Sequence, residues 1–273
     1  MLVLIAGAVA SGKAALSLQL ASRLDARRTS FGDFVRTEAR HRSLSLGYES
    51  LQALGDSLIG TMGWNEFCGG VMNQTPQWHE DEFVIVDGVR HVMAVTTLLR
   101  LAGRKEISVV FVQSPETRQL QLLRERGVAD FLSAESIMNS PNESEVELVR
   151  SMADMIVSSD GSMAELVEEM ALAFQITRSQ DIRSLLSSVT RASGLAITDL
   201  FPMLRLNEDA RLERLQMLDF LTDLLAPALP PTSMHHWLTT AKTALSGSTP
   251  LNLLLAPNPE RAFDVATQFL KGA

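Results

Sequence analysis

Short apolar runs alternate with helical periodicity along the first 175 residues of the chain. Leucine recurs at helical spacing after the first run, and residues 34–60, interrupted near Gly47, follow the same periodicity, as does the stretch at 161–174. Five segments predict strands or strand ends: LVLIA at 2–6, TSFG at 29–32, EFVIVDG at 82–88, ISVVFVQ at 107–113 and DMIVSSDG at 154–161. Strands that alternate with helices indicate the α/β class, with a parallel sheet covered by helices on both faces.

The strand pattern ends beyond Phe174. Residues 176–273 carry leucine at helical spacing, interrupted by glycine and proline. Thr249-Pro250 and Asn258-Pro259 each place a capping residue before a proline suited to the first turn of a helix. The sequence therefore predicts two domains, an α/β domain over 1–175 and a small all-α domain over 176–273.

A glycine-rich segment, GAVASGKA at 7–14, joins the first predicted strand to the first predicted helix. It matches the P-loop pattern G-x-x-x-x-G-K, in which backbone N–H groups and a helix N-terminus bind phosphate. Lys13 is the only lysine among the first hundred residues and is expected to reach the β- and γ-phosphates of a nucleotide. The sequence predicts a P-loop NTPase domain that binds ATP through these residues: Gly7, Ala8, Ala10, Ser11, Gly12, Lys13, Ala14 and Ala15.

Composition narrows the classes of function. A net charge of −8 argues against a nucleic-acid-binding surface. Cys68 is the only cysteine, which excludes an internal disulfide and a zinc cage and favours a reducing cytoplasm as the location. No apolar run is long enough to span a membrane, and residues 2–10 lead directly into a patterned helix, so we interpret them as a buried strand rather than a signal peptide.

Several segments of the first domain resemble P-loop kinases of the nucleoside-monophosphate-kinase type. SFGDFVR at 30–36 and VDGVR at 86–90 resemble the S-T-G-D-x-x-R and D-G-x-x-R segments of adenylate kinases. FVQSPETRQLQLLRERG at 111–127 resembles the strand, helix and arginine pair that lead into their lid. MADMIVSSDGSMAELVEEM at 152–170 is similar to the final strand and helix of dephospho-coenzyme-A kinases. The resemblance implies a small-molecule kinase that acts on a nucleotide or another small phosphoryl acceptor and uses ATP and Mg²⁺.

The same resemblance implies roles for individual residues. Arg36 and Arg90 would hold the acceptor, and the arginine pair that leads into the lid, Arg124 and Arg126, would hold the transferring phosphate. Arg40, one helical turn after Arg36, is a weaker candidate for the acceptor site. The alternative for these arginines is the ordinary exposed position of arginine on a protein surface. With Lys13, Asp33 and Asp87 they complete the implied catalytic set.

A metal site is implied less directly. Asp87, at the end of its predicted strand, would hold Mg²⁺ through water, and Asp33 is a second candidate. Adenylate kinases have Gly and then Thr after the P-loop lysine, and dephospho-coenzyme-A kinases have Ser-Thr. Ala14 and Ala15 lack both hydroxyls, which weakens the placement of the metal without forbidding it.

The segment in the position of the lid is acidic. Residues 127–149 contain no lysine or arginine but do contain Glu135, Glu143, Glu145 and Glu147, and Arg150 is the next cation along the chain. A working lid brings cations and excludes water, so this segment argues against catalysis.

The C-terminal segment at 234–273 resembles the toxin-binding domain of Xre, MbcA and ParS antitoxins. The features that match are Trp237-Leu238, Ala244-Leu245, Gly247, Thr249-Pro250-Leu251, Leu254 and a final amphipathic helix. The resemblance implies binding of a partner toxin, of the RES type in many of those systems, and also self-association as a homodimer. Two functions therefore remain open: an ATP-dependent kinase, and a non-catalytic antitoxin-like regulator whose P-loop domain senses nucleotide or serves as a scaffold.

Overall fold

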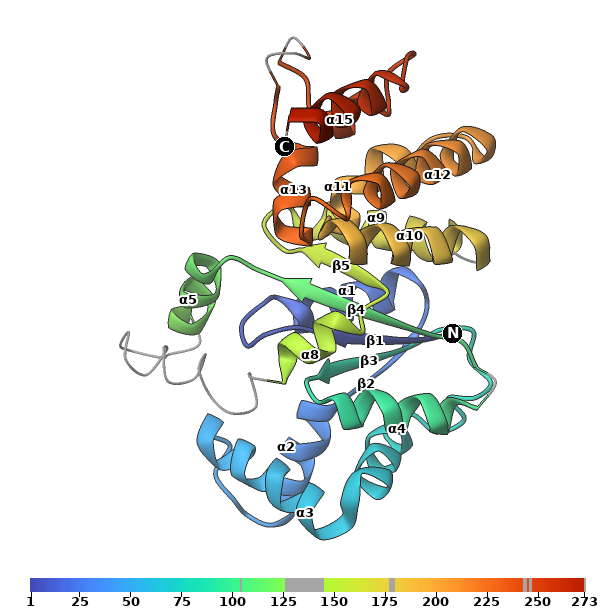
Figure 1. Cartoon of the computed structure of the whole chain (residues 1–273). Coiled ribbons are helices and arrows are strands. Elements are labelled where there is room, and N and C mark those ends of the chain that lie inside the picture. Colours follow the sequence, from blue (N-terminus) through green and yellow to red (C-terminus); the bar gives the residue numbers. More distant parts are fainter. Residues whose placement is uncertain (104, 126–144, 177–179, 243–244, 246, 273) are drawn as a thin grey trace. The chain divides into compact units, whose positions relative to one another are not determined.

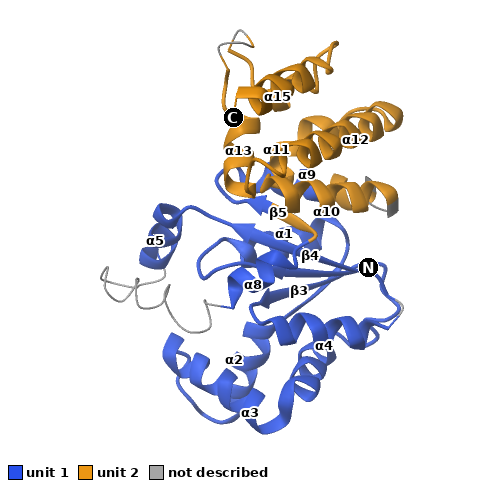
Figure 2. Ribbon diagram, in the orientation of Figure 1, with its two compact units in different colours: residues 1–153, 157–171 blue, residues 154–156, 172–273 orange. Residues whose placement is uncertain are grey.

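The computed structural model describes residues 1–103, 105–125, 145–176, 180–242, 245 and 247–272. The chain forms two compact units (Figure 2). Unit 1 is Met1–Ala153 with Val157–Ala171, and unit 2 is Asp154–Ile156 with Leu172–Ala273. The chain passes between the units three times: just before a strand, inside that strand, and inside a helix at 171–172, a few residues before the break that the sequence predicted.

A single five-stranded sheet has the order β2–β3–β1–β4–β5 (Figure 1). The strands are β1 (Leu2–Ala6), β2 (Arg27–Ser30), β3 (Val84–Val89), β4 (Ile107–Gln113) and β5 (Met155–Ser158). β1 pairs in parallel with β3 and β4, and β2 pairs in parallel with β3. All five residues of β1 are fully buried, which is why the run LVLIA is apolar without alternation.

Helices cover both faces of the sheet, as the sequence predicted. The connection from β1 to β2 runs along the sheet in one direction and the connection from β3 to β4 in the other, so right-handed crossovers place their helices on opposite faces. An ion pair at 2.8 Å between Arg23 and Glu168 joins α1 (Lys13–Arg23) to α9 (Met163–Ile176). α4 (Val92–Ala102) contacts α8 (Val146–Ser151).

Two helices between β2 and β3 form one wall beside the sheet. Ser30 is the N-cap of α2 (Phe31–His41), and its hydroxyl accepts from the Asp33 N–H at 3.3 Å. α3 (Tyr48–Asn73) extends past residue 60, where the sequence pattern ended, through a kink at Gly63. Gly63 leaves the helical region, with φ 75° and ψ 165°, so α3 consists of two helical segments joined at this kink, and burial of Phe67 and other apolar side chains packs the second segment. α5 (Glu116–Glu125) follows β4.

Unit 2 is helical apart from its part of β5. Its further elements are α10 (Gln180–Ser193), α11 (Ile197–Leu204), α12 (Glu208–Leu225), α13 (Pro231–Thr239), α14 (Pro250–Leu253) and α15 (Arg261–Gly272). Thr249 caps α14 by accepting from the Asn252 N–H at 3.0 Å, as its position before Pro250 predicted. Trp237 is 6% exposed and its ring lies 5.8 Å from that of Phe269. Ala244, one of the residues that carry the resemblance of 234–273 to antitoxins, lies outside the described residues.

No helix in the described part of the chain has the length and apolar character needed to cross a membrane.

Candidate functional site

The loop between β1 and α1 has the backbone geometry of an anion site. Gly7, Ala10 and Gly12 have φ values of 145°, 55° and 88°, and Gly12 is the N-cap of α1. Lys13 is 8% exposed, and its Nζ donates to the Ala8 carbonyl at 2.7 Å. Positive φ values at successive turns point backbone N–H groups toward one space, and the helix N-terminus adds partial positive charge there.

Gly7 is required by close packing as well as by its φ. A Cβ atom at this position would lie 2.5 Å from the Val112 carbonyl oxygen of β4. β1 and β4 are neighbours whose following connections lead away from each other, so the loop lies where ligands bind in open parallel sheets. The backbone at Gly7 therefore lies so close to the end of β4 that a side chain at this position would clash.

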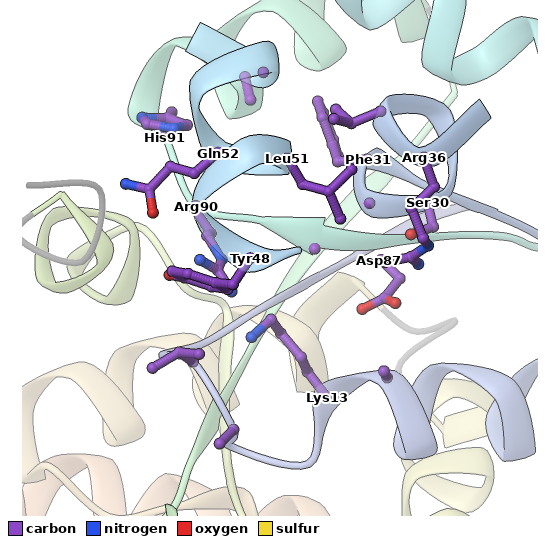
Figure 3. A pocket seen from close by; sticks show the side chains of 18 of the residues that line it. Lys13, Ser30, Phe31, Arg36, Tyr48, Leu51, Gln52, Asp87, Arg90 and His91 are labelled. Atoms are coloured by element: carbon purple, nitrogen blue, oxygen red, sulfur yellow. The ribbon is translucent and has the colours of Figure 1, made fainter. Parts of the chain in front are cut away.

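A cleft of about 480 Å³ opens in front of this loop (Figure 3). Its apolar wall comes from α2 and α3, with Phe31, Val35, Leu51, Ile59 and Phe67. Eight of the residues singled out from the sequence also line it: Ala10, Ser11, Gly12, Lys13, Ala14, Arg36, Asp87 and Arg90. The cleft thus joins the P-loop to the two arginines assigned to an acceptor.

The other residues singled out from the sequence lie elsewhere. Gly7, Ala8, Ala15 and Asp33 do not line the cleft, although Asp33 bonds to Arg36, which does. Arg124 is exposed near the end of α5 and does not line it either. Arg40 is exposed on α2. Arg126 and the acidic residues Glu135 and Glu143 lie outside the described residues.

The end of β3 directs Asp87 and Arg90. The pairing with β1 shifts between Ile5 and Ala6, which face Asp87 and Val89, so Gly88 is skipped and takes a φ of 86°. A bulge of this kind redirects the side chains beside it. Asp87 is 4% exposed, and its Oδ1 is buried without a hydrogen-bond partner. In Figure 3 the side chains of Lys13, Asp87 and Arg90 extend into the same space.

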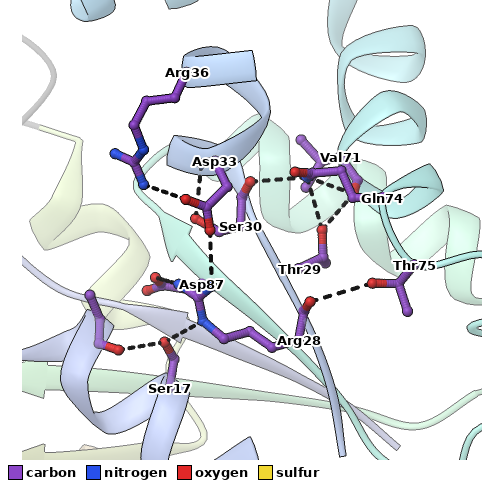
Figure 4. A network of polar contacts seen from close by, with 11 residues as sticks. Ser17, Arg28, Thr29, Ser30, Asp33, Arg36, Val71, Gln74, Thr75 and Asp87 are labelled. Carbon is purple, nitrogen blue, oxygen red and sulfur yellow. Dashed lines mark hydrogen bonds and ion pairs between the residues drawn. The ribbon is translucent and has the colours of Figure 1, made fainter. Parts of the chain in front are cut away.

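Arg28 on β2 links the acidic residues, and the sequence analysis missed it. Its Nη2 lies 2.6 Å from Asp87 Oδ2, its Nη1 lies 2.9 Å from Asp33 Oδ2, and its Nε donates to Ser17 Oγ at 2.9 Å (Figure 4). Ser17 Oγ in turn donates to the Ala14 carbonyl at 2.9 Å. The only feature of the sequence that could have indicated this role is the place of Arg28 in a short strand, two residues before Ser30. Its main partner, Asp87, lies 59 residues further along the chain.

Asp33 is held as a carboxylate. Burial alone would raise its pKa, but hydrogen bonds from Arg36 and Arg28 and the charges of both arginines outweigh this and lower the pKa below its ordinary value. Arg36 Nη2 bonds to Asp33 Oδ1, and Arg28 takes the other oxygen. Asp33 therefore fixes the positions of Arg36, which lines the cleft, and of Arg28, which does not.

His91 lines the cleft, and the sequence did not identify it as a site residue. Its Nδ1 lies 3.1 Å from Glu145 Oε2, and its ring centroid lies 5.2 Å from that of Trp64. Glu145 belongs to the acidic segment, so one acid of that segment faces a cleft histidine. Glu147 pairs instead with Arg150 at 3.7 Å.

Metal-ligating side chains do not cluster in the described part of the chain, where no group of three or more His, Cys, Asp or Glu residues is close enough to hold an ion. Cys68 is buried in α3, and burial raises the pKa of its thiol to about 12. It is therefore a packed apolar residue and not a nucleophile.

No protein-family model matches the chain. Among curated proteins it is similar to a UPF0200 protein of Thermococcus kodakarensis, with 25% identity over 175 residues that span 62% of this chain and 94% of that protein. A UPF0200 protein of Thermococcus gammatolerans is 26% identical over 170 residues, or 60% of this chain and 89% of that protein.

Solved structures give weaker likenesses. Shikimate kinase from Aquifex aeolicus has a TM-score of 0.37 and 16% identity, covering 64% of this chain and 96% of that one. A gluconokinase from Sinorhizobium meliloti has a TM-score of 0.35 and 13% identity, covering 61% and 86%. Scores this low add nothing to the fold, which the strand order and the loop after β1 already define.

Proposed function

We propose that unit 1 binds ATP at the P-loop and transfers its terminal phosphoryl group to a small anionic acceptor, such as a nucleotide. The observation that carries the proposal is the cleft that contains Lys13, Arg36, Asp87 and Arg90 together. Phosphoryl transfer depends mainly on positioning and on neutralising charge, and these are the properties that such a cleft supplies.

Each part of the cleft has a task in this proposal. Backbone N–H groups of the loop and Lys13 Nζ bind the β- and γ-phosphates, after Lys13 releases the Ala8 carbonyl. Arg36 and Arg90 bind the anionic group of the acceptor with planar, multiple hydrogen bonds. The apolar wall on α2 and α3 packs against the body of the acceptor and excludes water. The buried Asp87 Oδ1 accepts a hydrogen bond from a group inside the cleft.

The side chains do not fit a magnesium ion anchored by the protein. Ala14 has no hydroxyl, and Asp87, expected to hold Mg²⁺ through water, already shares its charge with Arg28, whose Nη2 lies 2.6 Å from Oδ2. Asp33, the other candidate, bonds to two arginines. Magnesium enters the proposal only as the counterion that ATP carries in solution.

The test is ADP formation from ATP with a panel of nucleoside monophosphates, nucleosides and dephospho-coenzyme A. Acceptor-dependent turnover that disappears in Lys13→Ala, and persists in the control Lys271→Ala on α15, would support the kinase. A thermal melt shows whether Lys13→Ala remains folded. Tight ATP binding without turnover for any acceptor would contradict the transferase part of the proposal.

The second candidate function is a non-catalytic regulator, and the specific observation that favours it is the loss of hydroxyls at Ala14 and Ala15. In this form ATP occupancy is sensed, and unit 2 binds a protein partner such as a RES-type toxin or a second copy of the chain. Unit 2 offers the exposed Phe220, 64% exposed, whose ring lies 5.8 Å from that of the half-buried Phe263. Co-expression with such a toxin, followed by size-exclusion chromatography of wild type and Phe220→Ser, tests this candidate.

A further inference from the structure

Arg28 bonds to the Ser17 hydroxyl near the first turn of α1 and to the two acids beside it. A P-loop commonly uses the hydroxyl after its lysine, and an acid at the end of a neighbouring strand, to hold Mg²⁺. Here the first group is missing at Ala14. The next hydroxyl along the helix, Ser17, donates to the Ala14 carbonyl at 2.9 Å and accepts from Arg28 Nε at 2.9 Å. The Ser17 hydroxyl therefore already acts as a donor to one partner and as an acceptor for another.

The acids near the loop are engaged in the same way. Arg28 Nη2 lies 2.6 Å from Asp87, and Nη1 lies 2.9 Å from Asp33, so one guanidinium uses three nitrogens on three partners. Arg36 bonds to the remaining oxygen of Asp33. The two carboxylates are thus balanced by two guanidinium groups, and no net negative charge remains in this cluster to attract a divalent cation.

Displacing Arg28 from this position is costly. The side chains of Arg28 and Asp87 are 17% and 6% exposed, and removing one member of so buried a pair leaves an uncompensated charge. Arginine also stays protonated throughout the usable pH range. The remaining acceptor, Asp87 Oδ1, needs only a neutral donor because Oδ2 already shares its charge with Arg28.

We infer that Arg28 takes the place of a protein-held metal, supplying the fixed positive charge behind the P-loop, so that this chain binds nucleotide with an affinity independent of Mg²⁺. The inference rests on the proposed nucleotide site and deepens it by naming the counter-charge of that site. A divalent cation, when present, is held by the phosphates of the nucleotide alone.

The test measures the dissociation constant of ADP and of a non-hydrolysable ATP analogue by calorimetry, in Mg²⁺ buffer and in EDTA. For wild type the two values are expected to agree within about threefold, a difference of less than about 0.7 kcal/mol. Tightening by Mg²⁺ of about tenfold or more would overturn the inference alone. Absence of binding in both buffers would overturn the proposed nucleotide site together with it.

Variants separate Arg28 from its surroundings. Arg28→Gln is expected to weaken binding in EDTA about tenfold or more and to acquire a Mg²⁺ dependence, because Asp87 is then free to hold a hydrated ion. Ala14→Ser restores a hydroxyl and is expected to remain independent of Mg²⁺ while Arg28 is present. A Mg²⁺ dependence in Ala14→Ser would overturn the inference, and this variant and wild type decide the question even where Arg28→Gln does not fold.

Arg27→Gln is the matched control. Arg27 is the residue before Arg28 on β2 and does not line the cleft. It forms an ion pair with Asp81 at 3.3 Å and donates a hydrogen bond to the Pro76 carbonyl at 2.8 Å. Its substitution removes the same charge from the same strand and is expected to leave both dissociation constants unchanged. Equal weakening in Arg27→Gln and Arg28→Gln would mean that overall charge, and not the Arg28 cluster, sets the affinity.

Discussion

Gly7→Ala tests the close approach of the P-loop to the sheet. Gly7 has a φ of 145°, and an alanine Cβ there would lie 2.5 Å from the Val112 carbonyl oxygen and 2.8 Å from Ser11 Oγ. The hydroxyl of Ser11 can rotate, but the carbonyl belongs to β4 and is fixed by the sheet. The substitution is therefore expected to destabilise unit 1 as well as the phosphate site.

The expected magnitude has two parts. Backbone at a φ that only glycine adopts readily costs about 1–3 kcal/mol. Ordinary contact begins at 3.4 Å, so the loop or the strand must move to relieve the 2.5 Å approach. Overpacking of this kind costs about 1–3 kcal/mol. The free energy of unfolding of unit 1 should therefore fall by about 2–6 kcal/mol, a large share of the stability of a typical domain.

Urea unfolding followed by tryptophan fluorescence measures this change. In a Trp237→Phe background the remaining tryptophans, Trp64 and Trp78, both lie in unit 1, so the signal reports unit 1 alone. With a slope near 2 kcal/mol per molar urea, the midpoint should fall by about 1–3 M.

Gly60→Ala in the same background is the control. Gly60 is exposed on α3 and a Cβ there meets nothing within 4 Å, so its replacement should leave stability unchanged or raise it by about 1 kcal/mol through helix propensity. If Gly7→Ala shifted the midpoint no more than Gly60→Ala, the reasoning about the β4 contact would be wrong.

Three further predictions concern stability and reactivity. The lowered pKa of Asp33 means that its pairs with Arg28 and Arg36 stabilise the fold above the ordinary aspartate value of about 4 and are lost as pH falls through the lowered folded-state value. The difference in unfolding free energy between wild type and Asp33→Asn should thus be constant from pH 5 to 7 and shrink below about pH 4; a difference that grows on acidification would contradict it. Cys68, with a thiol pKa of about 12, should resist iodoacetamide at pH 8 until urea unfolds the chain, as mass spectrometry would show; rapid labelling of native protein would refute its burial. Thr249→Ala removes a helix cap and should lower the thermal stability of unit 2 by about 1 kcal/mol, whereas Thr249→Ser should not, and equal losses would exclude the cap as the cause.

Local pattern was sufficient for much of the fold. The buried run LVLIA, the glycine-rich loop and the helix at Lys13 are consecutive, so their chemistry and geometry are both readable from neighbouring residues. The same holds for the cap at Thr249 and for the apolar strand that carries Asp87. Predictions of this kind depend on interactions within a few residues, where spacing along the chain determines spacing in space.

The extent of α3 and the position of His91 were not predictable in this way. Gly63 breaks the helical backbone close to residue 60, where the sequence pattern ended, and burial of Phe67 and its neighbours supports a second helical segment that continues to Asn73. His91 contacts Glu145, which lies 54 residues further along the chain, and neither residue type predicts such a partner.

The sequence by itself determined a phosphate-binding loop on a parallel α/β sheet, because a strand, a glycine turn and a helix N-terminus follow one another along the chain. Only the tertiary structure decided what surrounds that loop. β2 and β3 lie side by side because of the sheet order, and this places Arg28 on Asp87 and Asp33 and on Ser17 of α1. Charge balance depends on distances between such segments, and those distances are set by the fold and not by the order of residues.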